Sequence, residues 1–269
     1  MIPLVLGATY LGFPYFNIFI ALAVVLMAWE WRRMISSGHF GYQGVILAVG
    51  LLGSVLIASY NAYLNAVFLT VGVGVVFIAV TAARRLFSGL PLHSDEMNQA
   101  VHPQNSLWMA FGALYIGIPS LAFIWIRNDW ENGLVAVVWL LVLVWAADSG
   151  AYAAGRLIGG PKMAPKISPN KTWAGLAGCV VSAAVAGGIV AHLAGFEGLI
   201  KFIAVSAFVG LISQGGDLVE SAFKRHFKVK DSSNLIPGHG GVLDRVDALL
   251  AAVVAAALIN LVDKGSLVS

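Results

Sequence analysis

Long apolar runs recur along the whole chain, and they constrain its fold more than any other feature. A helix needs about 20 mostly apolar residues to cross the roughly 30 Å hydrocarbon core of a bilayer. Eight runs approach this length: residues 14–29, 42–59, 62–83, 106–126, 133–150, 173–194, 199–214 and 245–263. With 59% hydrophobic residues and a mean hydropathy of +0.85, the 269-residue chain lies outside the range of soluble proteins. We therefore expect an all-α, polytopic integral membrane protein.

The first eleven residues are also apolar, but they are too few to cross a bilayer without tilting. The first basic residue is Arg32, so this run lacks the charged start of a signal peptide. We expect a short ninth helix here. The chain then divides into N-terminal transmembrane helices, residues 1–130, and a C-terminal membrane region, residues 131–269. The C-terminal region carries two long polar loops, 151–172 and 215–244.

Basic residues are distributed unevenly between the two sides of the membrane that these spans imply. If residues 30–41 face the cytoplasm, alternation places 84–105, 151–172 and 215–244 on the same side. These segments, with Arg245 at the edge of the last, hold 13 of the 16 basic residues. Cytoplasmic loops collect Lys and Arg, so both polar loops should be cytoplasmic. Topology and anionic lipid headgroups then account for the pI near 9.0, and we expect no nucleic-acid partner.

Several small residues inside the apolar runs predict packing rather than chemistry. Cys179 is the single cysteine, which excludes an intrachain disulfide and a Cys-based metal site, and we expect it to be buried. The glycines of the runs should allow helices to approach closely. They are Gly72, Gly74, Gly175, Gly178, Gly187 and Gly188.

Carboxylates gather where apolar runs give way to the polar loops. Asp217 and Glu220 are three residues apart, as are Asp244 and Asp247, so on a helix each pair shares a face. Asp148 lies near the end of the earlier run 133–150. Carboxylates at membrane depth mark functional sites by default. Two like-charged pairs held close together would repel unless a cation lay between them, and Mg²⁺ prefers such oxygen ligands.

Basic groups surround these carboxylates in the sequence. They are Lys224, Arg225, Lys230, His239 and Arg245. They suit phosphate groups, and the backbone N–H groups of Gly240 and Gly241 can approach a phosphate closely. Acidic groups for a metal beside basic groups for phosphate are typical of phosphoryl or nucleotidyl transfer. The alternative is a solvated loop in which the charges form salt bridges.

The stretch SAFKRHFKVKDSSNLIPGHGGVLDRVD, residues 221–247, resembles the signature of the phosphatidate cytidylyltransferases, also called CDP-diacylglycerol synthases. Looser resemblances cover ADSGAY at 147–152, SPNKTW at 168–173 and GDLVES at 216–221. Together with the number of spans, they extend the resemblance over nearly the whole chain.

The resemblance implies that CTP and phosphatidic acid give CDP-diacylglycerol and pyrophosphate at the cytoplasmic face of the inner membrane. It also implies a requirement for Mg²⁺, with a second cation expected. The metal-ligand candidates are Asp217, Asp244 and Asp247, followed by Glu220 and Asp231. The cationic set above would hold the triphosphate and the lipid phosphate. Further substrate-binding candidates are Asp148, Lys166, Ser168, Lys171, Ser221, Gly240 and Gly241.

Other classes of protein make different predictions from the same residues. A secondary transporter could place a coupling ion between Asp148, Asp217 and Glu220, but it predicts inverted repeats, and the sequence shows none. A CTP-using polyprenol or phytol kinase is a nearer alternative. The CDP-alcohol phosphotransferases fit less well, because their Asp-Gly-x-x-Ala-Arg pattern is absent. Small residues on apolar helix faces are compatible with a homodimer.

Overall fold

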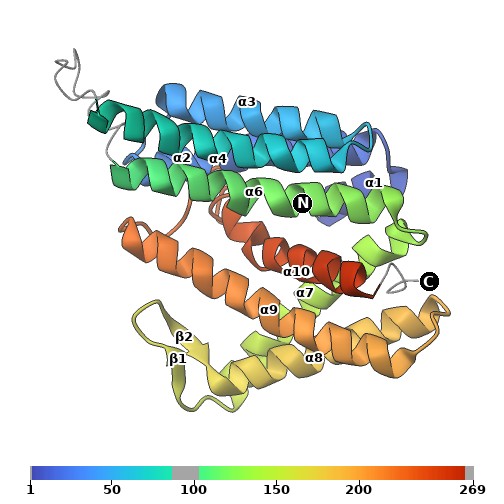
Figure 1. Cartoon of the computed structure of the whole chain (residues 1–269). Helices are drawn as coiled ribbons and strands as arrows, with labels where there is room; N and C mark the ends of the chain where they lie inside the picture. The colour runs from blue at the N-terminus through green and yellow to red at the C-terminus, as the bar shows by residue number, and fades with distance from the viewer. Residues whose placement is uncertain (1, 87–102, 264–269) are drawn as a thin grey trace. The chain divides into compact units, whose positions relative to one another are not determined.

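The computed structural model describes residues 2–86 and 103–263. Across these residues the chain forms nine helices and one two-stranded sheet (Figure 1). The helices are α1 (Ile2–Leu11), α2 (Tyr15–Ile35), α3 (Gly41–Ala58), α4 (Tyr63–Leu86), α6 (Pro103–Asp129), α7 (Gly133–Leu157), α8 (Trp173–Leu193), α9 (Leu199–His226) and α10 (Leu243–Val262). The strands β1 (Lys162–Ala164) and β2 (Ser168–Thr172) pair antiparallel. Most of the predicted cytoplasmic segment 84–105 lies outside the described residues.

The prediction of an all-α, polytopic membrane protein is confirmed. Among the described helices, seven are long and apolar enough to cross a membrane: α3, α4, α6, α7, α8, α9 and α10. Residues 15–29 of the run predicted at 14–29 lie in the 21-residue α2, which is not among these seven, and the predicted short N-terminal helix is the ten-residue α1.

Two helices extend well beyond their predicted spans. The helix α7 continues to Leu157 rather than ending at residue 150, and α9 continues to His226 rather than ending at residue 214. Asp217 and Glu220 therefore lie inside a helix, and the second polar loop begins at residue 227. The β1–β2 hairpin in the first polar loop is a further element that the sequence did not predict.

The chain forms two compact units that interleave in sequence. One unit contains residues 1–13, 125–230 and 244–269, and the other contains residues 14–124 and 231–243. The short segment 231–243, which includes the Pro-Gly-His-Gly-Gly turn, thus belongs with the N-terminal helices although residues of the other unit flank it in the chain.

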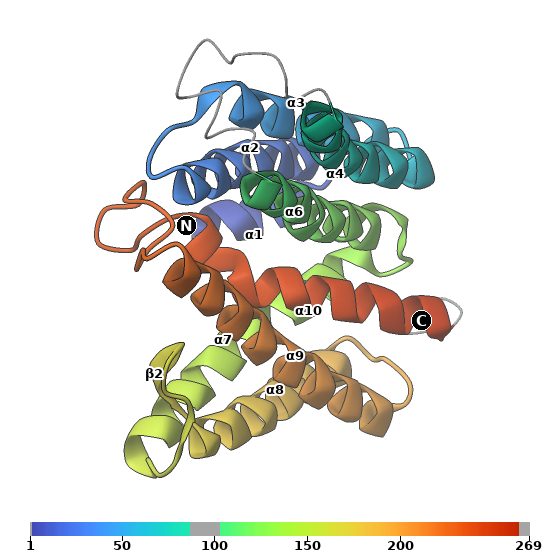
Figure 2. The ribbon, with the colours of Figure 1, turned by 60° about the vertical axis from the view of Figure 1, so that its left-hand side comes forward.

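Glycines allow the helices of the first unit to pack closely, because they have no side chain. The helices α7, α8 and α9 pack side by side (Figures 1 and 2). A Cβ atom on Gly178 of α8 would lie 2.5 Å from the carbonyl oxygen of Gly150 on α7. Cys179 beside it is fully buried, as predicted. Between α7 and α9, the indole of Trp139 donates a hydrogen bond of 3.0 Å to Ser206 Oγ.

In the second unit, α2 packs on α3 and α3 packs on α4. The fully buried Trp31 of α2 donates from its indole nitrogen to the carbonyl oxygen of Trp108 on α6 at 2.9 Å. Gly74 of α4 also contacts α6, because an added Cβ would lie 3.4 Å from the carbonyl oxygen of Ala110. Gly72 differs from the other predicted packing glycines, since a Cβ added there would meet nothing within 4 Å.

This difference predicts how two identical substitutions should behave. Gly178→Ala should lower the free energy of unfolding by about 1–3 kcal/mol, because the added methyl group forces α7 and α8 apart. Gly72→Ala should be close to neutral, because the space is open. Thermal unfolding of both variants in detergent, followed by tryptophan fluorescence, measures the effect. Equal losses in the two variants would contradict the close packing of α7 on α8.

Candidate functional site

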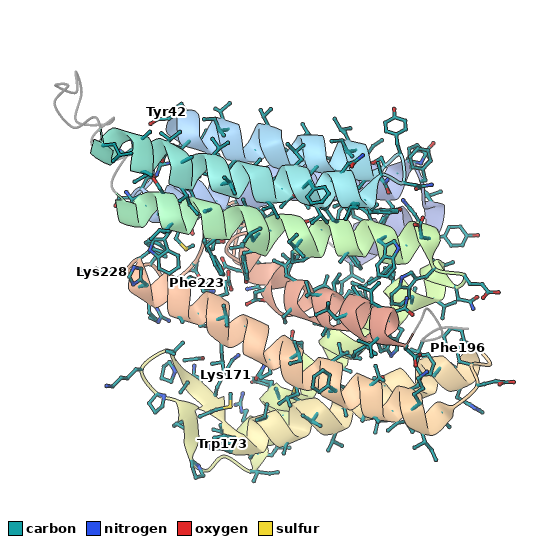
Figure 3. The ribbon with its side chains drawn as sticks, viewed as in Figure 1. Tyr42, Lys171, Trp173, Phe196, Phe223 and Lys228 are labelled. Atoms are coloured by element: carbon teal, nitrogen blue, oxygen red, sulfur yellow. The ribbon has the colours of Figure 1, made fainter. Side chains whose placement is uncertain are left out.

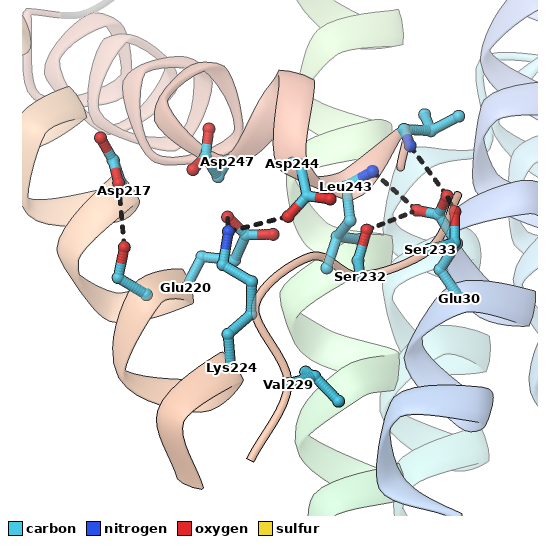
Figure 4. Close-up of polar contacts among 12 residues, drawn as sticks. Glu30, Asp217, Glu220, Lys224, Val229, Ser232, Ser233, Leu243, Asp244 and Asp247 are labelled. Atoms are coloured by element: carbon cyan, nitrogen blue, oxygen red, sulfur yellow. Dashed lines mark hydrogen bonds and ion pairs between the residues drawn. The ribbon is translucent and has the colours of Figure 1, made fainter. Parts of the chain in front are cut away.

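The carboxylate pairs of α9 and α10 lie together because the two helices cross closely at Gly216. A Cβ atom there would lie 2.6 Å from the Cβ of Ala251 and 2.9 Å from the carbonyl oxygen of Asp247. Both pairs lie on helical backbone, so the two members of each pair share a helix face. The close crossing brings Asp217 and Glu220 of α9 beside Asp244 and Asp247 of α10 (Figure 4).

The ammonium group of Lys224 joins the two helices. Its Nζ lies 3.0 Å from Oε2 of Glu220, one turn back along α9, and 2.8 Å from Oδ1 of Asp244 on α10. The side chains of Glu220, Asp244 and Lys224 are 0%, 4% and 13% exposed. Removing charges from water is costly unless each meets an opposite charge at hydrogen-bonding distance. This lysine therefore supplies the positive charge that lets two acidic side chains stay buried together.

A second lysine reaches the same cluster from the β1–β2 hairpin. Lys171 of β2, labelled in Figure 3, places its Nζ 2.7 Å from Oδ2 of Asp217. The other oxygen of Asp217 accepts a bond of 3.2 Å from Ser221 Oγ. The next residue, Thr172, caps α8 by accepting from the backbone N–H of Gly175 at 3.0 Å, which fixes where the strand ends. Asp148 of α7 is within electrostatic range of this ion pair.

The remaining carboxylate oxygens have the chemistry that a hard divalent cation requires. Oε1 of Glu220 is buried and accepts no hydrogen bond from the described residues, and the side chain of Asp247 lies next to it. Asp217 is close enough to act electrostatically on Asp247. In the described part of the chain, no three acidic, His or Cys side chains already form a metal-binding cluster. The oxygen donors thus suit Mg²⁺, but Lys224 and Lys171 hold some of them.

Other predicted site residues lie outside this cluster. The Arg225 guanidinium donates to the carbonyl oxygens of Ile167 and Val229, both at 3.3 Å, so it joins the hairpin to the end of α9. Arg245 is exposed but acts electrostatically on Asp148. Lys166 and Lys230 are also exposed, and Ser168 is half-buried at the start of β2. Asp231, His239, Gly240 and Gly241 belong to the segment 231–243 of the other unit.

One polar residue that the sequence analysis did not select is fully buried. Glu30 of α2 has no exposed surface, and its carboxylate accepts hydrogen bonds from the segment 231–243. The sequence carries a signal for it, because a carboxylate at the end of a long apolar run is a functional candidate by default. The nearby Arg32 and Arg33 instead indicate an ordinary charged helix end that contains Glu30.

The fold and the site together define a polytopic membrane protein in which lysines form ion pairs with carboxylates of two helices, α9 and α10. Comparison with known proteins adds the family. Residues 1–262 match the model of the cytidylyltransferase family. The chain is similar to a Brucella suis protein named phosphatidate cytidylyltransferase, with 37% identity over 90% of this chain and 81% of the relative. A Pseudomonas aeruginosa protein of the same name is 35% identical over 94% of this chain and 90% of the relative. A Haemophilus influenzae protein of the same name is 46% identical over 56% of each chain.

The chain therefore belongs to the cytidylyltransferase family. It is an enzyme, a nucleotidyltransferase of lipid biosynthesis.

The double ion pair of Lys224 predicts a specific rescue. Lys224→Met leaves two buried carboxylates without their cation, and losing one partner of a buried pair typically costs about 3–5 kcal/mol of stability. Adding Glu220→Gln removes one of the orphaned charges, so the double variant should recover part of that loss. Unfolding of the single and double variants in detergent measures both effects. The exposed Lys228→Ala is the matched control and should unfold like the wild type.

If Lys224→Met unfolds like Lys228→Ala, the lysine does not compensate the buried carboxylates. If the double variant is as unstable as Lys224→Met, the coupling between Lys224 and Glu220 is contradicted.

Proposed function

We propose that the enzyme transfers the cytidylyl group of CTP to phosphatidic acid and so forms CDP-diacylglycerol and pyrophosphate. The observation that carries the proposal is the cluster in which Lys171 and Lys224 hold the carboxylates of α9 and α10. This cluster lies in a chain that is similar, over nine-tenths of its length, to proteins named for this activity. Anionic and cationic groups side by side are what a reaction between two phosphate compounds requires.

The reaction requires no side-chain nucleophile. An oxygen of the phosphatidate headgroup, already anionic at neutral pH, attacks the α-phosphorus of CTP and forms a new P–O bond. The bond from that phosphorus to the oxygen bridging the α- and β-phosphates breaks, and the electron pair leaves with pyrophosphate. The protein's task is to align the two anionic substrates and to stabilise the charge that gathers on the α-phosphate and the leaving group.

The lysines of the cluster are placed to bind phosphate. An ammonium group has three hydrogen-bond donors. With the described residues, Lys224 uses two of them on Glu220 and Asp244, and Lys171 uses two on Asp217 and the carbonyl oxygen of Gln214. Each lysine therefore keeps a donor for a phosphate oxygen while its carboxylate partners hold it in place. Arg245 and Lys230, which belong to the same unit, are exposed and available to reach the outer phosphates.

The acidic residues would hold Mg²⁺. Asp217 and Asp247, with Oε1 of Glu220, are the ligands that the donor chemistry favours, and Asp244 would join them when Lys224 turns towards phosphate. A bound Mg²⁺ would neutralise charge on the phosphates of CTP. A second cation fits the same rule, because this cluster holds more carboxylates than one Mg²⁺ usually takes from a protein.

We further propose that the site faces the cytoplasm from the inner membrane. The 13 of 16 basic residues assigned to one side support this orientation, and CTP is a cytosolic substrate. A homodimer is part of the proposal, supported by a small residue on α4, Gly72, where an added Cβ would meet nothing within 4 Å and a second helix could approach closely.

Labelled CTP and phosphatidate, added to membranes that contain the protein, test the reaction. We expect labelled CDP-diacylglycerol, with turnover abolished by EDTA and restored by Mg²⁺. Asp217→Asn should lower kcat by about 100-fold or more, the scale seen when one charge-stabilising group is removed, whereas Lys228→Ala should keep full activity. A phosphorylated lipid alcohol would identify a lipid kinase instead, and a lack of any nucleotide chemistry would favour a transporter.

Cysteine accessibility in intact cells tests the orientation. In a Cys179→Ala background, Asn234→Cys and Pro165→Cys should resist a membrane-impermeant thiol reagent until the cytoplasmic side is opened. Glu131→Cys, in the turn between α6 and α7, should react from outside. All three positions are exposed in the structure, so burial does not block labelling. Labelling of Asn234→Cys from outside would overturn the proposed orientation.

A further inference from the structure

The carboxylate of Glu30, outside the lysine cluster, accepts four hydrogen bonds. Oε1 accepts from Ser233 Oγ at 2.6 Å and from the backbone N–H of Val242 at 2.8 Å. Oε2 accepts from Ser232 Oγ at 3.3 Å and from the backbone N–H of Leu243 at 2.8 Å. Figure 4 shows this carboxylate facing both serines and the start of α10. Four donors thus converge on one side chain with no exposed surface.

These four donors stand at the two ends of one loop. Ser232 and Ser233 lie at the start of the loop, and Val242 and Leu243 lie at its end. The hydrogen bonds of Glu30 therefore hold the two ends of the loop, its stems, next to each other. Between the stems the chain makes a tight turn, in which Ile236 N–H donates to the carbonyl oxygen of Gly240 at 2.9 Å and His239 N–H donates to that of Ile236 at 2.9 Å. Gly238 and Gly240 take positive φ angles of 74° and 81°, which favour glycine.

The two residues before α10 have no side chain that can cap the helix. A helix start leaves backbone N–H groups without partners, and a Ser, Thr, Asp or Asn side chain usually satisfies one of them. Gly241 and Val242 precede α10, and neither has an acceptor in its side chain. Glu30, more than 200 residues earlier in the chain, fills this role with a negative charge, which also suits the positive end of the helix dipole.

Gly241 gives an independent reason to regard the arrangement as specific. A Cβ atom at this position would lie 2.5 Å from Oε1 of Glu30 and closer still to Ser232 Oγ. The loop can therefore wrap the carboxylate only because residue 241 has no side chain. This requirement does not depend on any contact of Gly241 with substrate.

We propose that Glu30 is a positioning residue, which clamps the loop 231–243 through Ser232, Ser233, Val242 and Leu243 and so fixes His239 and the first turn of α10. Asp244 follows Leu243 directly in the chain, so the clamp also fixes the backbone from which this carboxylate extends. The inference rests on the proposed function for its effect on catalysis, whereas its effect on the loop stands without it.

Glu30→Gln is the decisive variant. An amide keeps the size of the side chain but offers one acceptor oxygen in place of two, so one of the backbone N–H groups of Val242 and Leu243 must face an NH₂ group. The serine hydroxyls can reorient, but the backbone N–H groups cannot. We expect hydrogen–deuterium exchange in 231–243 to become at least about tenfold faster, while exchange in α3, residues 41–58 of the same unit, stays unchanged. The exposed Glu197→Gln is the matched control.

Kinetics supply the second measurement. With CTP and phosphatidate, Glu30→Gln should lower kcat by about tenfold to a hundredfold. Glu30→Asp keeps both acceptor oxygens on a shorter stem and should recover part of the activity and of the exchange protection. An order of wild type, Asp and then Gln in both measurements supports the clamp. Wild-type exchange and wild-type kcat in Glu30→Gln would overturn it.

Two further variants keep the test sharp if Glu30→Gln fails to fold. Ser233→Ala removes one donor and should loosen 231–243 mildly, whereas Gly241→Ala pushes against the carboxylate and should loosen it strongly. Unchanged exchange in both variants would equally overturn the clamp. If the wild-type protein makes no CDP-diacylglycerol, the proposed function fails, but the exchange measurements still decide whether Glu30 holds the loop.

Discussion

The arrangement of α9 and α10 depends on compensating charges that are withdrawn from water. Lys224 is the centre of this compensation, because its ammonium group is within 3.0 Å of one carboxylate on each helix. Without it, Glu220 and Asp244 would repel each other in a region that water cannot screen. The missing side chain of Gly216 permits the close crossing, Lys224 offsets part of the acidic charge there, and the crossing in turn gathers the remaining acidic side chains.

Periodicity and hydropathy predicted much of this organisation. Apolar runs located most of the helices, and the rule that residues three apart share a helix face applies to Asp217 with Glu220 and to Asp244 with Asp247, since all four lie on helical backbone. The same reasoning ended α9 too early, because the polar stretch from residue 214 onward reads as a loop. Residues such as Glu220, Ala222 and Lys224 favour a helix, and the ion pairs of Lys224 allow its polar turns to stay buried.

Contacts between distant segments could not be predicted in this way. Nothing in the sequence says that Lys171 selects Asp217, since the pairing depends on the hairpin, whose strands have three and five residues and no clear alternation. The sequence predicts that Arg225 binds phosphate, and it gives no sign that the guanidinium donates to carbonyl oxygens of the chain. The role of Glu30 could not be predicted for a related reason. A single acidic residue forms no pattern with its neighbours in sequence, and all four of its hydrogen-bond donors come from the far end of the chain.

The sequence distance between Glu30 and its partners affects how the protein is made. Residue 30 leaves the ribosome long before Val242 is synthesised, because Val242 lies 212 residues further along the chain. During that interval the carboxylate has none of the donors that later surround it, so water, lipid headgroups or the insertion machinery must accommodate it. A nascent chain that stops short of residue 242 therefore lacks both backbone N–H groups that bind Glu30 in the finished protein.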